Sequence, residues 1–254
     1  MFLKLFKHTF CKNLKTVIVL FSTSVAISLL TGILYYISKS VKHSVYLTGF
    51  VETVLAFSRL AISILCSIPV IMNYYAFHKS IATDEAYLTF TLPATTKQHI
   101  NSRILSIICW SIISAIILGI SLSVLSAFTY KNTLPEINLD INLTAENVIT
   151  IIEIIILAIA VELASILHVV FAIVLNGALS TKIKGKGSAI IVVLILYAEI
   201  TILGVICVLG ILFAVSAEMH VNAILPIAIL IVLALGVLAY YLSYKMLDRG
   251  LNVA

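Results

Sequence analysis

Six long apolar runs dominate this 254-residue chain and decide what it can fold into. A helix needs about 20 apolar residues to cross the hydrocarbon core of a bilayer, and each run reaches that length. A helix also satisfies its own backbone hydrogen bonds, as lipid requires. We therefore predict an all-α integral membrane protein with one transmembrane domain over residues 1–254. Its spans are expected at residues 17–37, 53–77, 104–128, 148–175, 188–215 and 223–244.

The scarcity of charge excludes the other main classes of protein. Hydrophobic residues make up 62% of the chain and charged residues 11%, whereas soluble domains have about 45–50% and about 25%. So few charges cannot cover a surface that faces water, and the same composition excludes a disordered chain. The net charge of +5 does not indicate a nucleic-acid partner, because the basic residues are spread out and lie mostly beside the apolar runs.

The distribution of lysine and arginine predicts the topology. Inner segments of bilayer proteins are enriched in these residues. If the N-terminus is cytoplasmic, the outer segments hold only Lys39, Lys42 and Lys131, and Arg59 lies inside a span. Both termini are therefore expected in the cytoplasm. The inner segments then hold Lys4, Lys7, Lys12, Lys15, Lys79, Lys97, Arg103, Lys182, Lys184, Lys186, Lys245 and Arg249.

Residues 1–16 carry an amphipathic pattern ahead of the first span. At about 100° per residue, the large apolar side chains fall on one half of a helix and the lysines on the other, with Asn13 as the exception. This pattern is typical of a helix that lies in the membrane interface. The alternative is an ordinary positively charged flank that forms no helix.

A second short helix is predicted at residues 84–93, in the inner loop between the second and third spans. Its sequence is DEAYLTFTLP. Thr83 is placed to cap a helix that begins at Asp84, and Pro93 ends it. Apolar side chains in a water-facing loop are costly to expose, so the helix is expected to dock against a partner; the alternative is a solvated connector. The apolar side chains concerned are Tyr87, Leu88 and Phe90.

This run resembles the E-x-Y-L-T-x-T-L-P signature between the second and third spans of bacterial ATP-binding-cassette (ABC) exporter permeases of the type-2 class. The six-span plan with both termini inside is similar to that family, as is an N-terminal interfacial elbow helix. The outer loops after the first and fifth spans, at about residues 38–52 and 216–222, are short here, unlike those of members with large external domains. The residues that match the signature are Glu85, Tyr87, Leu88, Thr89, Thr91, Leu92 and Pro93.

The resemblance implies a working transporter of two permease chains, identical or homologous, and a dimer of cytoplasmic ATPase subunits. It implies that residues 84–93 form the coupling helix that sits in a groove of the ATPase. ATP and Mg²⁺ would bind on the ATPase, and the cargo would be an amphipathic peptide or a hydrophobic compound crossing a bacterial inner membrane. The residues implied in coupling are Asp84, Glu85, Tyr87, Leu88, Thr89, Phe90, Leu92 and Pro93.

The sequence of this chain shows no motif for ATP binding, metal binding or disulfide formation. The chain contains no GxxxxGK[ST] phosphate-binding loop, which an ATPase of this kind would need. The four cysteines stand far apart without a CxxC pair, so no metal or disulfide framework is indicated. We therefore expect a transport subunit and not an enzyme, with no cofactor bound to this chain. A membrane scaffold or a membrane enzyme stays the weakest alternative.

Four acidic or basic residues other than histidine lie inside the predicted spans: Arg59, Glu153, Glu162 and Glu199. Such groups are expensive in lipid and are functional candidates by default. They predict either a polar translocation path or interhelical contacts that hold the bundle together, such as an ion pair between Arg59 and Glu153. Glu162 and Glu199 also permit a second hypothesis, a proton-coupled secondary transporter. Two carboxylates close together in lipid would favour a protonated state in at least one of them.

Overall fold

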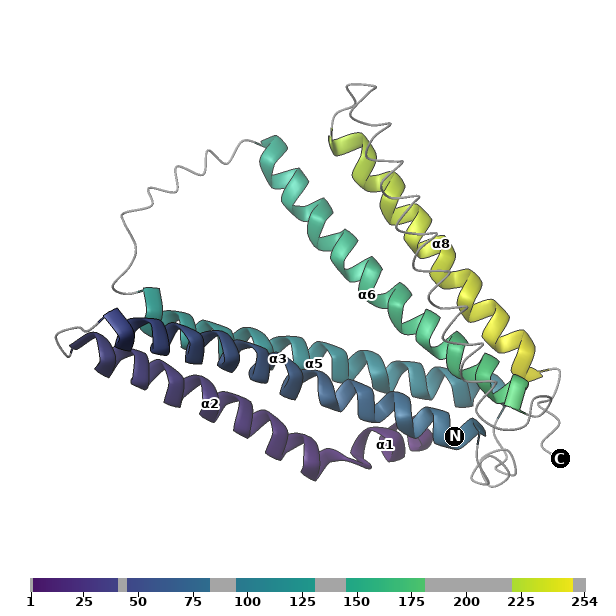
Figure 1. The fold of residues 1–254 in the computed structure, drawn as a ribbon. Coiled ribbons are helices and arrows are strands. Elements are labelled where there is room, and N and C mark those ends of the chain that lie inside the picture. Colours follow the sequence, from purple (N-terminus) through teal and green to yellow (C-terminus); the bar gives the residue numbers. More distant parts are fainter. Residues whose placement is uncertain (1, 41–44, 83–94, 131–144, 181–220, 249–254) are drawn as a thin grey trace. The chain divides into compact units, whose positions relative to one another are not determined.

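The computed structural model describes residues 2–40, 45–82, 95–130, 145–180 and 221–248. In these ranges the chain is α-helical and contains no strand (Figure 1). The helices in chain order are α1 (Phe2–Cys11), α2 (Leu14–Ser40), α3 (Val45–Ala82), α5 (Thr96–Tyr130), α6 (Ala145–Ser180) and α8 (Val221–Asp248). The predicted all-α class is therefore confirmed for the described part of the chain.

Five of these helices are long and apolar enough to cross a membrane, as in a multi-pass membrane protein. They contain five of the six predicted spans, and the predicted span 188–215 lies outside the described residues. Most of their surface is apolar and exposed, which suits contact with lipid. The stretches that qualify are Leu14–Ser38, Gly49–Ile81, Thr96–Thr129, Ile151–Leu179 and Leu225–Asp248.

Helices α3 and α5 extend well beyond the predicted spans. The prediction began the second span at residue 53 and the third at residue 104, whereas the helices begin at Val45 and Thr96. Hydropathy marks only the part of a helix that suits lipid, while backbone hydrogen bonding continues through neighbouring polar residues. The helix ends are therefore set by capping and turns.

The N-terminal segment is a separate helix, and Asn13 explains why it ends. The chain turns at Lys12 and Asn13, between α1 and α2. The Val17 amide donates to the Asn13 carbonyl at 3.1 Å, which is the first hydrogen bond of α2. Asparagine is a favoured residue at this N-cap position, so the residue that broke the amphipathic pattern begins the next helix. Helix α1 therefore ends at Cys11, before the end predicted at residue 16.

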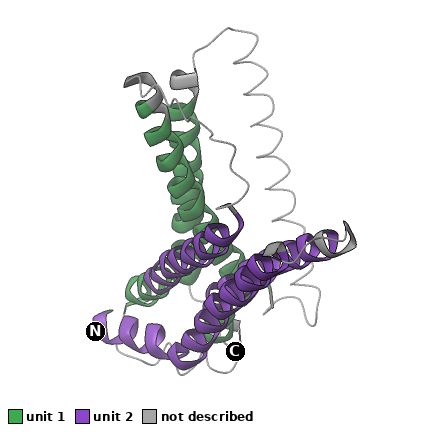
Figure 2. Cartoon of the chain, turned by 90° about the vertical axis from the view of Figure 1, so that its left-hand side faces the viewer, with its two compact units in different colours: residues 1–2, 74–104, 141–254 green, residues 3–73, 105–140 purple. Residues whose placement is uncertain are grey.

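The chain divides into two compact units (Figure 2). Unit 1 comprises Met1–Phe2, Tyr74–Ile104 and Ile141–Ala254, and unit 2 comprises Leu3–Asn73 and Leu105–Asp140. In unit 2, α2, α3 and α5 run alongside one another (Figure 1). Their core joins Leu55, Ile62 and Cys66 of α3 to Leu125 of α5. Partly buried side chains packed around it are Ile27, Tyr35, Ile117 and Leu118.

Small residues bring the helices of unit 2 close together. Ser24 and Ser28 of α2 are fully buried, and their hydroxyls donate to the carbonyls of Phe21 and Val25 at 2.8 and 2.7 Å. A buried hydroxyl satisfied within its own helix leaves a small, apolar-like surface for a neighbouring helix. Gly32 of α2 has no room for a side chain, because an added Cβ would overlap the ring of Phe128 in α5.

A buried polar contact joins α3 to α5 beside a proline. The Ser106 hydroxyl donates to Asn73 Oδ1 at 3.3 Å, and Asn73 Nδ2 donates to the carbonyl of Pro69 at 2.8 Å. Pro69 lies inside α3 and supplies no backbone donor, so this part of the helix lacks one of its regular bonds. Asn73 therefore bonds both to the Pro69 carbonyl within its own helix and to the neighbouring helix.

Replacement of Asn73 by alanine is expected to reduce the free energy of unfolding by about 1 kcal/mol, since interhelical hydrogen bonds in membranes are individually modest. Ser106→Ala should cost less, because Asn73 keeps its bond to Pro69. Denaturant titration of the purified chain in detergent measures both. A loss for Ser106→Ala equal to that for Asn73→Ala would contradict the double role of Asn73.

In unit 1, α6 and α8 pack side by side. The residues of α8 that are buried recur along one stripe, Gly236, Ala239, Ser243 and Leu247. A Cβ added to Gly236 would lie 3.2 Å from the Ala164 Cα and 3.4 Å from its Cβ. The two backbones thus approach closely where both side chains are small, as is common between helices in membranes.

Candidate functional site

The candidate site lies where α3 ends and α5 begins, on either side of the predicted coupling helix at residues 84–93. Those residues lie outside the described part of the chain, so the structure tests neither that helix nor its role. The structure does describe the two helix ends that enter and leave it, Ala82 and Thr96, and both belong to unit 1. The predicted coupling residues concerned are Asp84, Glu85, Tyr87, Leu88, Thr89, Phe90, Leu92 and Pro93.

Helix α5 starts with a cap that fixes the exit from this segment. The Thr95 hydroxyl accepts from the Gln98 amide at 3.4 Å, and the Thr95 carbonyl accepts from the His99 amide at 3.1 Å. Threonine at the N-cap with glutamine three residues later is the sequence pattern of a capping box. Hydropathy does not detect this pattern, and α5 begins at Thr96, ahead of the span predicted from residue 104.

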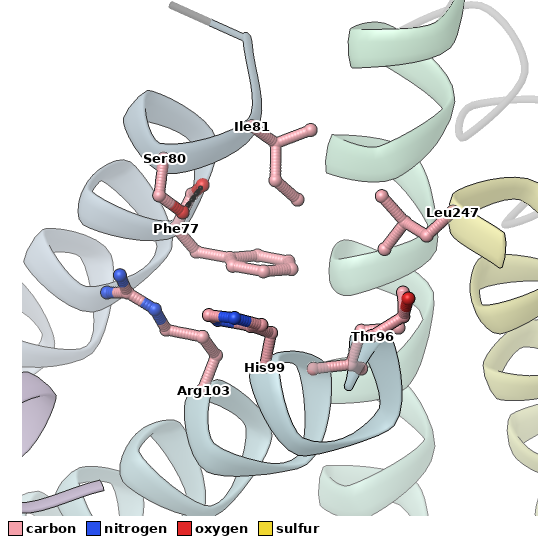
Figure 3. A pocket seen from close by; sticks show the side chains of 8 residues that line it. Phe77, Ser80, Ile81, Thr96, His99, Arg103 and Leu247 are labelled. Carbon is pink, nitrogen blue, oxygen red and sulfur yellow. Dashed lines mark hydrogen bonds between the residues drawn. The ribbon is translucent and has the colours of Figure 1, made fainter. Parts of the chain in front are cut away.

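The ends of α3, α5 and α8 enclose a small pocket of about 20 Å³. Figure 3 shows the Phe77 ring and the His99 imidazole pointing into the same space, with Leu247 of α8 beside them. This is the size that holds a single water molecule, so the three helix ends are closely packed here. The lining residues are Phe77, Ser80, Ile81, Thr96, His99, Ile100, Arg103 and Leu247.

The α3 end of the site is tied to α6. Asn176 Nδ2 lies 3.0 Å from His78 Nε2, within hydrogen-bond distance. Both side chains are half-buried, where a hydrogen bond is stronger than in water. Asn176 lies near the C-terminal end of α6, so the last turns of α3 and α6 are joined by side chains as well as by packing.

The α5 start is tied to α8 by two further contacts. The Tyr240 hydroxyl donates to Asn101 Oδ1 at 2.8 Å. One turn further along α8, the Tyr244 ring lies under Lys97, with 4.9 Å between Nζ and the ring centroid, a cation–π distance. Lys97 and Asn101 are four residues apart on α5, and Tyr240 and Tyr244 are four residues apart on α8. Two neighbouring side chains of α5 therefore meet two of α8.

These contacts define what the site is able to do. Residues 83–94 enter from α3 and leave into α5, and each of these helix ends is fastened to a long helix of unit 1. A displacement of the segment would therefore be passed to α6 and α8, because close-packed helices shift as whole bodies and do not deform gradually. Within the described ranges, no group of three or more His, Cys, Asp or Glu side chains is placed to hold a metal ion.

The predicted intramembrane residues are only partly described. Arg59 is exposed on α3 within unit 2, while Glu153 is half-buried and Glu162 exposed on α6 within unit 1. The spacing of nine residues puts the two glutamates on opposite faces of α6. Glu162 lies close enough to Tyr74 to interact with its hydroxyl electrostatically. Glu199 lies outside the described residues.

The tyrosines of α8 are residues whose role sequence reasoning did not find. Their position at the end of an apolar run predicts membrane-interface anchors, and the sequence carries no signal that pairs Tyr240 with Asn101 or Tyr244 with Lys97. Such pairs depend on which helices are neighbours.

Comparison with known proteins finds no similarity: the chain matches no family model, no curated protein and no solved structure.

Proposed function

We propose that the chain is the membrane permease subunit of an ATP-driven exporter of the ABC type, residing in a bacterial inner membrane with both termini in the cytoplasm. Residues 84–93 would contact a separate ATPase dimer, which binds ATP and Mg²⁺, and a second permease chain would complete the transporter. The cargo would be an amphipathic peptide or a hydrophobic compound. In this role the chain is a transport subunit without enzyme activity of its own.

One observation supports this proposal above the others. The two helix ends that flank the predicted coupling segment are held to α6 and α8 by His78–Asn176, Asn101–Tyr240 and Lys97–Tyr244. A segment that passes force from an ATPase to membrane helices needs this kind of attachment. A solvated connector between two spans would not need it. The sequence DEAYLTFTLP adds the apolar and acidic side chains through which a partner would hold the segment.

Purification of the chain in mild detergent from its own membranes tests the proposal. The expected result is that a soluble ATPase with the nucleotide-binding motifs of ABC proteins co-purifies in a one-to-one ratio. ATP hydrolysis should accompany the complex and be absent from the permease chain alone. A correctly inserted chain that purifies without any ATPase under these conditions would contradict the proposal.

The tyrosine contacts yield a separable prediction. In the Tyr240→Ala/Tyr244→Ala chain, the ATPase should still bind, but the equilibrium constant for the movement of α8 on ATP addition should fall about tenfold. One lost hydrogen bond and one lost cation–π contact together amount to about 1.4 kcal/mol, which corresponds to that factor. A fluorophore on Val237→Cys, introduced after the native cysteines are replaced by serine, reports the movement at an exposed position of α8.

Tyr241→Ala is the matched control for this measurement. Tyr241 is a neighbouring exposed tyrosine, and its ring lies 5.6 Å from the Nζ of Lys245 on the same helix. Its removal should therefore leave the response to ATP unchanged. An equal loss of response in the control would show that the α5–α8 contacts have no special part in coupling.

Glu162 favours one alternative, a proton-coupled secondary transporter. Its carboxyl group stands in the middle of an apolar helix, near Tyr74, where ionisable groups commonly serve in proton relays. In that case a pH gradient without ATP would drive transport by the chain alone in proteoliposomes. Glu162→Gln and Glu199→Gln would abolish the transport. Transport that requires ATP and the partner subunit would exclude this alternative.

A further inference from the structure

The outward face of α1 gathers positive charge into one shallow hollow. The hollow has a volume of about 500 Å³, and all of the side chains that line it are exposed. The lining residues are Lys4, Lys7, His8, Cys11 and Lys12. Their spacing places them on one face of α1 and on the turn after it. Three ammonium groups on one exposed face attract anions.

Among the described residues of unit 2, the protein places no such anion beside α1. The only acidic side chain among these described residues is Glu52. Glu52 is near the start of α3, which follows the far end of α2 (Figure 1). The 27 residues of α2 rise about 40 Å, and the Debye length at physiological salt is only about 8 Å. Glu52 therefore does not neutralise the α1 lysines.

Aromatic stacking holds this basic face in a fixed position. The Phe10 ring of α1 stacks on Trp110 of α5, with centroids 4.6 Å apart and planes at 14°. Phe6 stacks on Phe10 at 5.6 Å, and Phe21 of α2 adds a tilted contact to Trp110 at 6.3 Å. Offset and tilted ring pairs stabilise beyond their buried area. The helix thus turns its aromatic side to the bundle and its lysines outward.

The hollow also lies beside the start of a stretch long and apolar enough to cross a membrane. The first membrane-crossing stretch begins at Leu14, directly after the turn that ends α1. Leu3, beside Lys4 and Lys7 on the outward face, is 74% exposed. A leucine so exposed is unfavourable in water but favourable in the acyl region just below lipid headgroups. A dissolved anion would satisfy the lysines only, whereas a phospholipid satisfies both.

We propose that this face of α1 is a binding site for an anionic phospholipid. The lysines at positions 4, 7 and 12 contact the headgroup phosphate, and Leu3 lies against the acyl chains. The charge of the lipid complements that of the lysines, and the stack on Trp110 fixes α1 in register with the bilayer surface. This inference does not depend on the proposed transport function, because it concerns the chain and its lipid alone.

The only tryptophan of the chain, Trp110, provides the test. The full chain is placed in nanodiscs of phosphatidylcholine that contain the same minor mole fraction of either brominated phosphatidylglycerol or brominated phosphatidylcholine. Bromine on the acyl chains quenches tryptophan at short range. The anionic lipid is expected to accumulate near α1 and to quench Trp110 as if enriched roughly two- to fivefold, the size of effect expected of basic residues at an anionic surface.

Charge variants separate this site from general lipid contact. K4Q/K7Q/K12Q should quench equally with both brominated lipids, while K4R/K7R/K12R keeps the charge and should retain the preference. An unchanged Trp110 emission in unbrominated phosphatidylcholine confirms that the Phe10–Trp110 stack survives in each variant. Equal quenching in the native chain, or a preference that persists in the glutamine variant, would overturn the proposal. So would loss of the preference on addition of inorganic phosphate at constant ionic strength, because the site would then bind free phosphate.

Discussion

A chain that carries Leu88→Asp should insert into the membrane normally and bind no ATPase. An apolar side chain of this size contributes about 1.5–3 kcal/mol when it is buried in a groove, and a buried unpaired carboxylate adds a further penalty of several kcal/mol. Together they correspond to a loss in affinity of more than about hundredfold. Tyr87→Asp should have a similar effect, and co-purification with quantified ATPase measures both.

Conservative variants at the same positions control for damage to the fold. Leu88→Met preserves volume and apolar character and should retain the ATPase, since such swaps cost less than about 1.5 kcal/mol. Tyr87→Phe keeps the aromatic body. Thermal unfolding of the chain should be the same in all of these variants. If both aspartate variants retained the ATPase, residues 84–93 would not form the contact with it.

The second large effect is expected where α8 approaches α6 closely, at Gly236 and Ala164. Gly236→Leu should destabilise the α6–α8 pair by about 3 kcal/mol, because the new side chain would meet the Ala164 backbone and overpacking costs of this order are typical. The free energy of unfolding of a folded protein is only about 5–15 kcal/mol, so this loss is a large fraction of it. Thermal unfolding in detergent measures the loss.

Two further substitutions, one at another glycine and one at Gly236 itself, are matched controls. A Cβ added at Gly119 of α5 meets no atom within 4 Å, so Gly119→Leu should be neutral or stabilising through better helix propensity. Gly236→Ala should fall between these extremes, because the gain in propensity is offset by a contact of 3.2 Å with Ala164 Cα. Equal stability of Gly236→Leu and Gly119→Leu would refute close packing of α6 on α8.

The membrane-crossing helices could be predicted because lipid is a demanding solvent. It requires long apolar segments with internal hydrogen bonds, so α2, α3, α5, α6 and α8 are visible in the sequence as apolar runs. Their ends were predicted less well, since polar caps decide them. Asn13 and the Thr95–Gln98 pair are both recognisable caps that hydropathy ignores.

The candidate site was predicted less completely than the helices. The sequence indicates that the segment between α3 and α5 has a reason to dock, but not what holds its ends. The Asn101–Tyr240 and Lys97–Tyr244 contacts join residues more than 130 positions apart, and local patterns carry no information on such pairing. Leu3 shows the same limit. It belongs to the apolar side of the predicted N-terminal helix, yet it is exposed beside the lysines because the stack of Phe10 on Trp110 sets the rotation of α1.

Photo-crosslinking from position 87 tests the central claim most directly. A benzophenone amino acid replaces Tyr87, and for comparison it replaces Phe57, which is 73% exposed within a membrane-crossing helix. The account predicts that irradiation of native membranes joins position 87 to the ATPase subunit, while position 57 captures lipid. Crosslinks from position 87 that reach only lipid or this chain itself would contradict it.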